Sequence, residues 1–233
     1  MLLRRLKPII ENRKLIPNHQ FGFRHHHSTI DQVHRITNVI EKALENKHIA
    51  SSVFLDVAQA FDKVWHEGLE YKLHRDLPRQ YLLLKSYLAN RHFRVKQDDK
   101  YSDLKATSAG VPQGSVLGPV LYLLYTRDLP SSDDVTIATF PDDTAILAVG
   151  ENVEQATRKL QTTVDKVVKW TKTWRVKLNE NKSAHVNFTN RKIATLDVNI
   201  NSSKVPYVES VKYLGMTLDS KLNWNKKHLQ KKK

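Results

Sequence analysis

The chain has 233 residues, with 38 Lys and Arg against 24 Asp and Glu, which gives a formal net charge of +14. This length can bury a hydrophobic core, and the basic charge favours a polyanionic partner such as nucleic acid, although charge alone is equally compatible with a merely soluble basic protein. The absence of cysteine excludes disulfides and thiolate zinc sites.

The hydrophobic pattern along the chain predicts alternating helices and strands. Ser28-Thr29-Ile30-Asp31 resembles a capping box, and apolar residues at helical spacing follow it to about Asn46. Residues 53–57 form a nearly continuous apolar run with β-branched and aromatic members, which predicts a strand covered on both faces. Asp56 carries the single charge of that run.

Later segments add two hairpins and further helices. The Asp98-Asp99 turn joins two strand-like segments, and Pro119 is compatible with a helix only in its first turn. We expect helices over 66–76, 79–89, 115–128 and 152–173, strands over 92–97, toward 109, over 135–140 and 144–149, and short strands between 183 and 218. This mixed order predicts an α+β fold with helices packed on one sheet.

Three aspartates are candidates for a metal site. Asp56 ends one buried-type strand, and Asp142 and Asp143 lie at the tip of a hairpin with strand-like flanks. If these strands are neighbours, the three carboxylates converge, and their repulsion calls for a cation such as Mg²⁺. A pair of such ions can stabilise both ends of a phosphoryl transfer. An Asp-Asp pair in a turn is also explained by turn chemistry alone, because Asp tolerates the backbone that turns require.

Three segments occur in the order and at the spacings of a polymerase palm domain. They are Asp56-Val57-Ala58-Gln59-Ala60-Phe61-Asp62, the sequence AGVPQGSVLGP at 109–119, and Phe140-Pro141-Asp142-Asp143-Thr144-Ala145. Through them the chain resembles the reverse transcriptases of jockey-like non-LTR (LINE-type) retrotransposons, from the first helix to about Trp224. The resemblance implies a right-hand polymerase fold whose antiparallel palm sheet packs on helices.

The resemblance also implies a division into subdomains. Residues 1–49 and 78–112 correspond to fingers that are incomplete at the N-terminus, 50–77 and 113–190 to the palm, and 191–233 to the primer-grip hairpin and the start of the thumb connection. We expect a chain truncated at both ends, because a first fingers element, most of the thumb and an endonuclease domain have no counterpart in it. Independent, processive retrotransposition is therefore not expected.

The catalytic residues follow from the same resemblance. Asp56, Asp142 and Asp143 match the catalytic aspartates of the family, and together with Val57 they match the ligands of two Mg²⁺ ions, which Mn²⁺ can replace. Phe61 matches a bulky steric gate whose ring collides with a ribose 2′-hydroxyl, so that deoxynucleotides are preferred. Ordinary core packing is the alternative explanation for Phe61.

Further matches concern the nucleotide, the template and the primer. Gln113 and Gly114 match an element that lies against the incoming nucleotide and template, and Arg24 matches a fingers residue that helps to hold them. Lys182 matches a lysine that aids the departure of pyrophosphate, and Tyr213-Leu214-Gly215 resembles the primer-grip hairpin. The alternatives are solvated surface cations for Arg24 and Lys182 and a core aromatic for Tyr213.

One position departs from the family pattern. Pro141 stands where alanine is usual, and it removes a backbone donor at a strand end. If the amide at 141 is needed for the hairpin, a catalytic carboxylate is displaced, and a shift of roughly 1 Å can reduce a rate about a hundredfold.

The expected function is that of a reverse transcriptase that extends a DNA primer on an RNA template with deoxynucleoside triphosphates, by two-metal phosphoryl transfer. The first alternative is an inactive retrotransposon remnant that retains the fold and nucleic-acid binding, and the second is an unrelated basic RNA-binding or scaffolding protein. No run of about 18 apolar residues and no signal-peptide order is present, so we expect an unexported protein without membrane contact, with nuclear access if it is active.

Overall fold

The computed structural model describes residues 2–141 and 143–223. These residues form two compact units. The first unit comprises the chain up to Pro17, Gln59–Asp128 and Trp174–Val176, and the second comprises Asn18–Ala58, Leu129–Thr173 and the chain from Lys177 onward.

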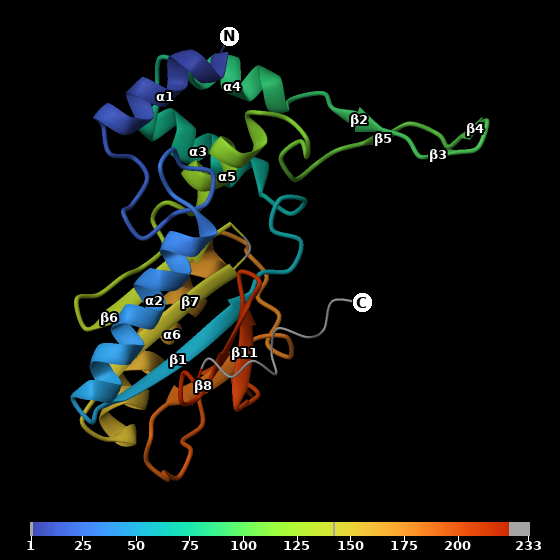
Figure 1. The fold of residues 1–233 in the computed structure, drawn as a ribbon. Helices are drawn as coiled ribbons and strands as arrows, with labels where there is room; N and C mark the ends of the chain where they lie inside the picture. The colour runs from blue at the N-terminus through green and yellow to red at the C-terminus, as the bar shows by residue number, and fades with distance from the viewer. Residues whose placement is uncertain (1, 142, 224–233) are drawn as a thin grey trace. The chain divides into compact units, whose positions relative to one another are not determined.

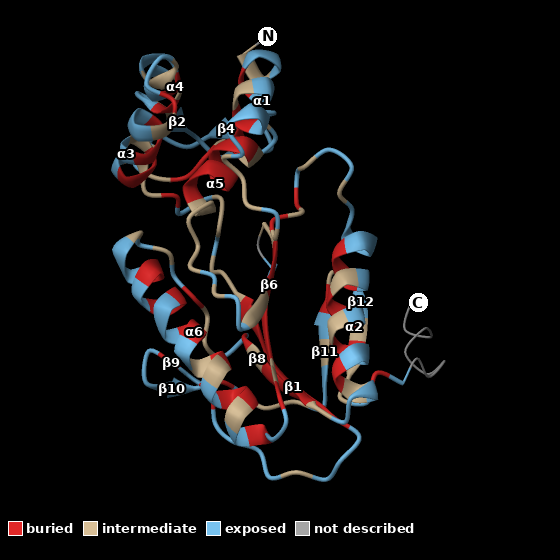
Figure 2. Cartoon of the chain, turned by 90° about the vertical axis from the view of Figure 1, so that its left-hand side faces the viewer, coloured by how far each residue is buried: buried red, intermediate tan, exposed pale blue. Residues whose placement is uncertain are grey.

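The second unit is built on a four-stranded antiparallel sheet with the strand order β6-β7-β1-β8 (Figure 1). Figure 2 shows helices α2 and α6 on opposite sides of this sheet, with buried residues along the strands between them. The elements of the unit are α2 (Thr29–Glu45), β1 (Ile49–Asp56), β6 (Val135–Phe140), β7 (Asp143–Gly150), α6 (Val153–Thr173), β8 (Ala184–Phe188), β9 (Asn199–Ile200), β10 (Ser203–Lys204), β11 (Ser210–Tyr213) and β12 (Met216–Asp219).

Successive residues of β1 pack on different helices. Phe54 belongs to the hydrophobic cluster that contains Ile36 of α2, whereas Val53 belongs to the cluster that contains Leu160 of α6. All but the last residue of β1 are buried, since neighbouring side chains of a strand point to opposite faces and both faces are covered. The expectation of a strand covered on both sides is therefore confirmed.

Helix α2 begins with the capping box that the sequence predicts. The backbone N–H of Asp31 donates to Ser28 Oγ at 3.1 Å, and the Asp31 carboxylate accepts from the backbone N–H of Ser28 at 2.9 Å. These two bonds satisfy backbone donors that the first turn of a helix leaves free. The start of α2 is therefore fixed by local chemistry.

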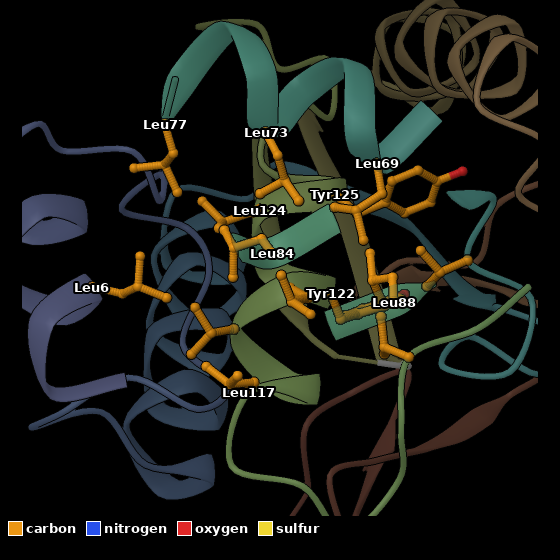
Figure 3. Close-up of a cluster of buried hydrophobic side chains, with 14 of the residues drawn as sticks. Leu6, Leu69, Leu73, Leu77, Leu84, Leu88, Leu117, Tyr122, Leu124 and Tyr125 are labelled. Atoms are coloured by element: carbon orange, nitrogen blue, oxygen red, sulfur yellow. The ribbon is translucent and has the colours of Figure 1, made fainter. Parts of the chain in front are cut away.

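The first unit is a helical cluster around one hydrophobic core. Figure 3 shows Leu6 of α1, Leu73 of α3 and Leu124 of α5 among the side chains of this core. The helices are α1 (Leu2–Asn12), α3 (His66–Asp76), α4 (Tyr81–Leu88) and α5 (Gly118–Thr126). Helix α5 begins three residues later than expected, and Pro119 lies in its first turn, where a missing N–H has no cost.

A two-stranded arm, residues 92–106, extends from the helices of the first unit (Figure 1). Its strands are β2 (His92–Phe93) paired with β5 (Lys105–Ala106), and β3 (Lys96–Gln97) paired with β4 (Lys100–Tyr101). Every residue of these strands is exposed. Asp98 has a φ of 52°, as the first residue of a primed hairpin turn requires, so the turn expected at Asp98-Asp99 is confirmed.

The elements agree with the predicted α+β class, and the sheets are antiparallel. The helices of the second unit cover both faces of its main sheet. Within the described residues, no helix combines the length and the apolar character needed to cross a bilayer.

Candidate active site

The candidate site lies where β1 ends beside the first residue of β7. The register pairs Asp56 with Asp143 as the last residues of the β1–β7 ladder, and it pairs Asp143 with Phe140 on the other side. The condition set from the sequence, that these two strands are neighbours, is therefore met for Asp56 and Asp143. Asp142, the third aspartate, lies outside the described residues.

The pairing of two acidic residues affects the protonation of Asp143. Partial burial raises the pKa of the Asp143 carboxyl, and the negative charge of Asp56 raises it further. Two like charges on adjacent strands are unfavourable unless a cation neutralises them. Carboxylate oxygens are the ligands that a hard divalent cation such as Mg²⁺ prefers, so the donor set of this strand end suits such an ion.

The residues described here do not by themselves complete a metal site. Within residues 2–141 and 143–223, no three acidic or imidazole side chains are grouped so that they could hold an ion. Val57 directly follows Asp56 and forms an isolated bridge with Leu178. Among the described residues, Asp56 and Asp143 are therefore the two carboxylates that the β1–β7 register brings to this strand end.

The loop that carries Lys182 is fastened to the end of β1. The N–H of Asp56 donates to Ser183 Oγ at 3.2 Å, and Asp56 O accepts from Asn179 N at 2.9 Å. Ser183 Oγ in turn donates to Asn179 O at 2.8 Å. The structure thus brings the loop of Lys182 to the same strand end as Asp56. Asn179 and Ser183 were not expected from the sequence, because short polar residues in a loop give no signal of a partner in a distant strand.

In the first unit, the segments around Phe61 and Gln113 are joined. Val111 N donates to Phe61 O at 2.8 Å, and Gln113 Nε2 donates to the carboxylate of Asp62 at 2.6 Å. Gly114 has a φ of 76°, a backbone that favours glycine. The half-buried ring of Phe61 stacks on Tyr122 with centroids 4.7 Å apart, so it has a packing role in any case.

Arg24 follows a segment that runs along the edge of β6. Its Nη1 donates to Gln20 O at 3.1 Å, and Gln20 forms a parallel bridge with Thr139. Half-buried His19 lies in the same segment, where burial and then the charges of Arg35 and Arg24 lower the pKa of its imidazole to about 4. The structure therefore places Arg24 in the same unit as Asp56 and Asp143.

The expected primer-grip residues form a tight hairpin turn. Tyr213 pairs with Met216, and Leu214 and Gly215 have φ values of 47° and 87°, which are typical of a type I′ turn. The Tyr213 ring is buried against Phe54, and its hydroxyl donates to Ala138 O at 3.3 Å. Burial raises the pKa of Tyr213. The tyrosine side chain is therefore a core aromatic, whereas Gly215 in the turn is exposed.

Pro141 is compatible with the hairpin that carries the aspartates. The β6–β7 ladder ends at the pair Phe140–Asp143, so the connection contains only two residues and Pro141 lies beyond the last pair. The first residue of a two-residue hairpin connection contributes no N–H to the ladder. The condition under which proline would disrupt the pairing is therefore not met.

Comparisons with known proteins agree with the motifs. The sequence profile of the family described as "Reverse transcriptase (RNA-dependent DNA polymerase)" matches residues 1–218. The RNA-directed DNA polymerase from mobile element jockey of Drosophila melanogaster is 43% identical over 235 residues, which cover 97% of this chain and 26% of that protein. The probable RNA-directed DNA polymerase from transposon X-element of the same species is 39% identical over 228 residues, covering 95% of this chain and 25% of that protein.

Solved structures show the same fold at low sequence identity. Apo telomerase from Candida tropicalis, truncated from its C-terminal domain, aligns with a TM-score of 0.61 and 13% identity over 92% of this chain and 44% of that one. The chain spans about a quarter of the length of the curated relatives it matches. The resemblance to jockey-like retrotransposon enzymes is confirmed, and the chain belongs to the reverse transcriptase family.

Proposed function

We propose that this chain is part of the catalytic core of an RNA-directed DNA polymerase, which extends a DNA primer along an RNA template. The observation that carries the proposal is the pairing of Asp56 with Asp143 at the end of two buried strands, in a chain of the reverse transcriptase family. The pKa of Asp143, raised by burial and by Asp56, supports the binding of a cation at this place.

The proposed metal ligands are the carboxylates of Asp56, Asp142 and Asp143 and the backbone of Val57. They would hold two Mg²⁺ ions, with Mn²⁺ as a substitute. When bound, these ions stabilise charge on the phosphates and favour the ionised form of the primer 3′-hydroxyl. The bonds that join Asn179 and Ser183 to the backbone of Asp56 fix the end of β1, the position from which the Asp56 carboxylate would reach an ion.

Other residues have proposed roles toward the substrates. Phe61 excludes a ribose 2′-hydroxyl, and its stack on Tyr122 supports a fixed ring. Gln113 and Gly114 lie against the incoming nucleotide and template, and Arg24 helps to hold them. Lys182 donates a proton to the departing pyrophosphate, which its place in the Asn179–Ser183 loop supports.

The proposal also assigns a primer contact and the subdomain ranges. The turn after Tyr213 contacts the primer end, whereas the Tyr213 ring is buried against Phe54 and takes no part in that contact. In the right-hand arrangement, residues 1–49 and 78–112 correspond to fingers, 50–77 and 113–190 to the palm, and 191–233 to the primer-grip hairpin and the thumb connection.

Nucleic acid as partner is supported by charge. Beyond the net charge of +14, the arm carries an exposed surface in which Arg94 lies 4.1 Å from the centre of the Tyr101 ring and Lys96 lies 5.6 Å from it. Cations beside exposed aromatic rings are typical of surfaces that bind single-stranded nucleic acid, through phosphates and base stacking. Binding of an RNA oligonucleotide should therefore weaken with salt, by roughly 0.7 logarithmic units for each phosphate contact per tenfold increase in salt.

The testing experiment is incorporation of labelled deoxynucleotides on a primed RNA template with Mg²⁺. The parent, Asp56→Asn and Pro141→Ala are compared at equal protein concentration. Incorporation by the parent that Asp56→Asn abolishes supports the proposal. Incorporation only by Pro141→Ala identifies a silenced polymerase.

If no variant incorporates nucleotide and the parent binds primer-template, the chain alone is not a polymerase. The remaining function is then nucleic-acid binding by an inactive remnant. The proline at position 141 favours this second candidate, because alanine is usual at this position in the family.

A further inference from the structure

The segment before Arg24 is tied to the strand that leads into the aspartate turn. Phe21 N donates to Thr139 O at 3.0 Å, and Thr139 N donates to His19 O at 3.0 Å. These are the bonds of the parallel bridge between Gln20 and Thr139. Residues 19–21 are therefore joined to the β6 edge of the main sheet by a single bridge at Thr139, the residue before Phe140.

A single glutamine side chain binds both strands of this bridge. Gln32 of α2 is fully buried, and its Nε2 donates to His19 O at 3.1 Å and to Thr139 O at 3.0 Å. Both bonds are made by Nε2, whereas Oε1 is buried without a hydrogen-bond partner among the described residues, so the two Nε2 contacts alone hold the amide in place. Gln32 thus links α2, the 19–22 segment and the end of β6.

Gly22 packs directly against the ring of Pro141. A Cβ atom on Gly22 would lie 2.1 Å from Pro141 Cδ and 2.7 Å from Cγ, far inside contact distance. Gly22 does not have the positive φ found at Gly110, Gly114 and Gly215. Space beside the proline ring, and not an unusual φ, therefore requires glycine at this position.

We propose that Gly22 and Gln32 are positioning residues for the aspartate turn. Gln32 holds the 19–22 segment on the end of β6, and Gly22 in that segment packs on Pro141, the residue that enters the turn. The same segment continues into Arg24, so one packed unit sets the positions of Arg24 and of the turn. The catalytic consequence rests on the proposed function, whereas the packing relation does not.

The first test is a double-mutant cycle on stability. Gly22→Ala in the parent overpacks the contact. It should raise the equilibrium constant for unfolding about 10- to 100-fold, as overpacking in cores does. In the Pro141→Ala background, Cγ and Cδ are gone, and the nearest remaining atom is the backbone N at 3.1 Å from the added Cβ. The same substitution should then cost at most about threefold.

Gly150→Ala is the matched control for this cycle. A Cβ there would lie 2.6 Å from Ala156 N, so the substitution is also overpacked, but it lies at the other end of β7. Its cost should be equal in both backgrounds. An equal cost of Gly22→Ala in both backgrounds overturns the packing relation.

The second test measures kcat and KM of nucleotide incorporation at a temperature where every variant is folded. Under that condition, a change in kcat reports on the position of the turn and not on a loss of folded protein. Gly22→Ala should lower kcat about a hundredfold, the size expected for roughly 1 Å of misplacement. The double variant Gly22→Ala/Pro141→Ala should have a kcat at least tenfold higher than that of Gly22→Ala. Gln32→Met, which keeps length but removes the donor, should lower kcat in the same direction, while Gly150→Ala changes it less than twofold.

The outcomes distinguish the inference from the proposed function. A folded Gly22→Ala variant with the kcat of the parent, or a loss that Pro141→Ala does not restore, overturns the positioning role even if the parent is active. If neither the parent nor Pro141→Ala incorporates nucleotide, the proposed function has failed. The stability cycle then decides alone whether Gly22 and Pro141 are coupled.

Discussion

The β3–β4 hairpin and the β6–β7 hairpin both contain two consecutive aspartates, and the surroundings of these two pairs differ. Asp98 and Asp99 connect strands whose residues are all exposed, in an arm outside the helical core. Asp143 instead begins β7, an inner strand of the four-stranded sheet, and the next five residues are buried.

The neighbouring strand, rather than the Asp-Asp pair itself, distinguishes the candidate metal site from the turn in the arm. In the arm, the positive φ of Asp98 accounts for the acidic turn, because Asp tolerates this backbone better than most residues. In the sheet, β1 adds Asp56 opposite Asp143, and partial burial, followed by the charge of Asp56, raises the pKa of Asp143. A dipeptide that is ordinary turn chemistry in one place is therefore a candidate metal site in the other.

The largest expected effect concerns catalysis. Asp143→Asn should reduce nucleotide incorporation at least about a thousandfold, because metal-based charge stabilisation contributes several kcal/mol to such reactions. The double variant Asp98→Asn/Asp99→Asn changes the same dipeptide chemistry in the arm and should retain activity within about twofold. Primer extension on an RNA template measures both, and comparable losses would show that the arm turn also serves catalysis.

The second effect concerns stability. Phe188 is fully buried in the cluster under α2, so Phe188→Ala should lower the free energy of unfolding by about 3–5 kcal/mol. Phe93 in the arm is 54% exposed, and Phe93→Ala should change that free energy by less than about 0.5 kcal/mol. Urea unfolding monitored by circular dichroism provides the comparison. A loss of several kcal/mol for Phe93→Ala would mean that the arm is packed in solution.

The third effect is a pH dependence within the sheet. His185 is buried beside Ser51 Oγ at 3.0 Å, and burial lowers the pKa of its imidazole to about 4. The unfolded chain, with an ordinary pKa of about 6.5, binds the proton first as pH falls. This contribution to stability is complete above pH 6.5 and is lost toward pH 4, amounting to about 2 kcal/mol between pH 7 and 5.

A matched pair of variants isolates that contribution. His19 adds a change of the same sign, because its pKa is also lowered to about 4, so the slope of the parent exceeds that of His185 alone. His185→Gln should flatten the slope of unfolding free energy against pH, and His92→Gln in the exposed arm should leave it unchanged. Identical slopes for the parent and His185→Gln would contradict a neutral buried imidazole.

Local signals in the sequence predict much of this fold. The capping box of α2, the apolar run of β1 and the Asp98-Asp99 turn depend on neighbours within a few residues, and the structure contains all three. Helix α1 was not expected, because the charges and Pro8 in LLRRLKPIIEN obscure the helical spacing of Leu6 and Ile10, which are buried. Tertiary packing against the first unit's core outweighs that weak local pattern.

The candidate site was predictable only in part, because some of its contacts join residues that are distant along the chain. Asp56 and the aspartate turn end strand-like segments, so their convergence could be expected from the pattern. The contact of Gln32 with Thr139 joins residues 107 positions apart, and the role of Gly22 depends on the ring of Pro141. A buried glutamine in an amphipathic helix and a glycine in a loop carry no local mark of partners so distant along the chain.

The smallest effect separates local from global stability. Asp98→Val places a β-branched residue at a φ of 52°, which costs roughly 1–2 kcal/mol in the arm turn. Because the arm has no buried strand residues, this cost should open the arm alone and leave the global free energy of unfolding within about 0.5 kcal/mol. Amide hydrogen exchange should accelerate at Ser102, whose N–H donates to Val95 O, while amides of β1 keep their protection. If β1 exchanges faster as well, the two hairpins are energetically coupled, and the contrast between a local turn and a sheet-supported site no longer holds.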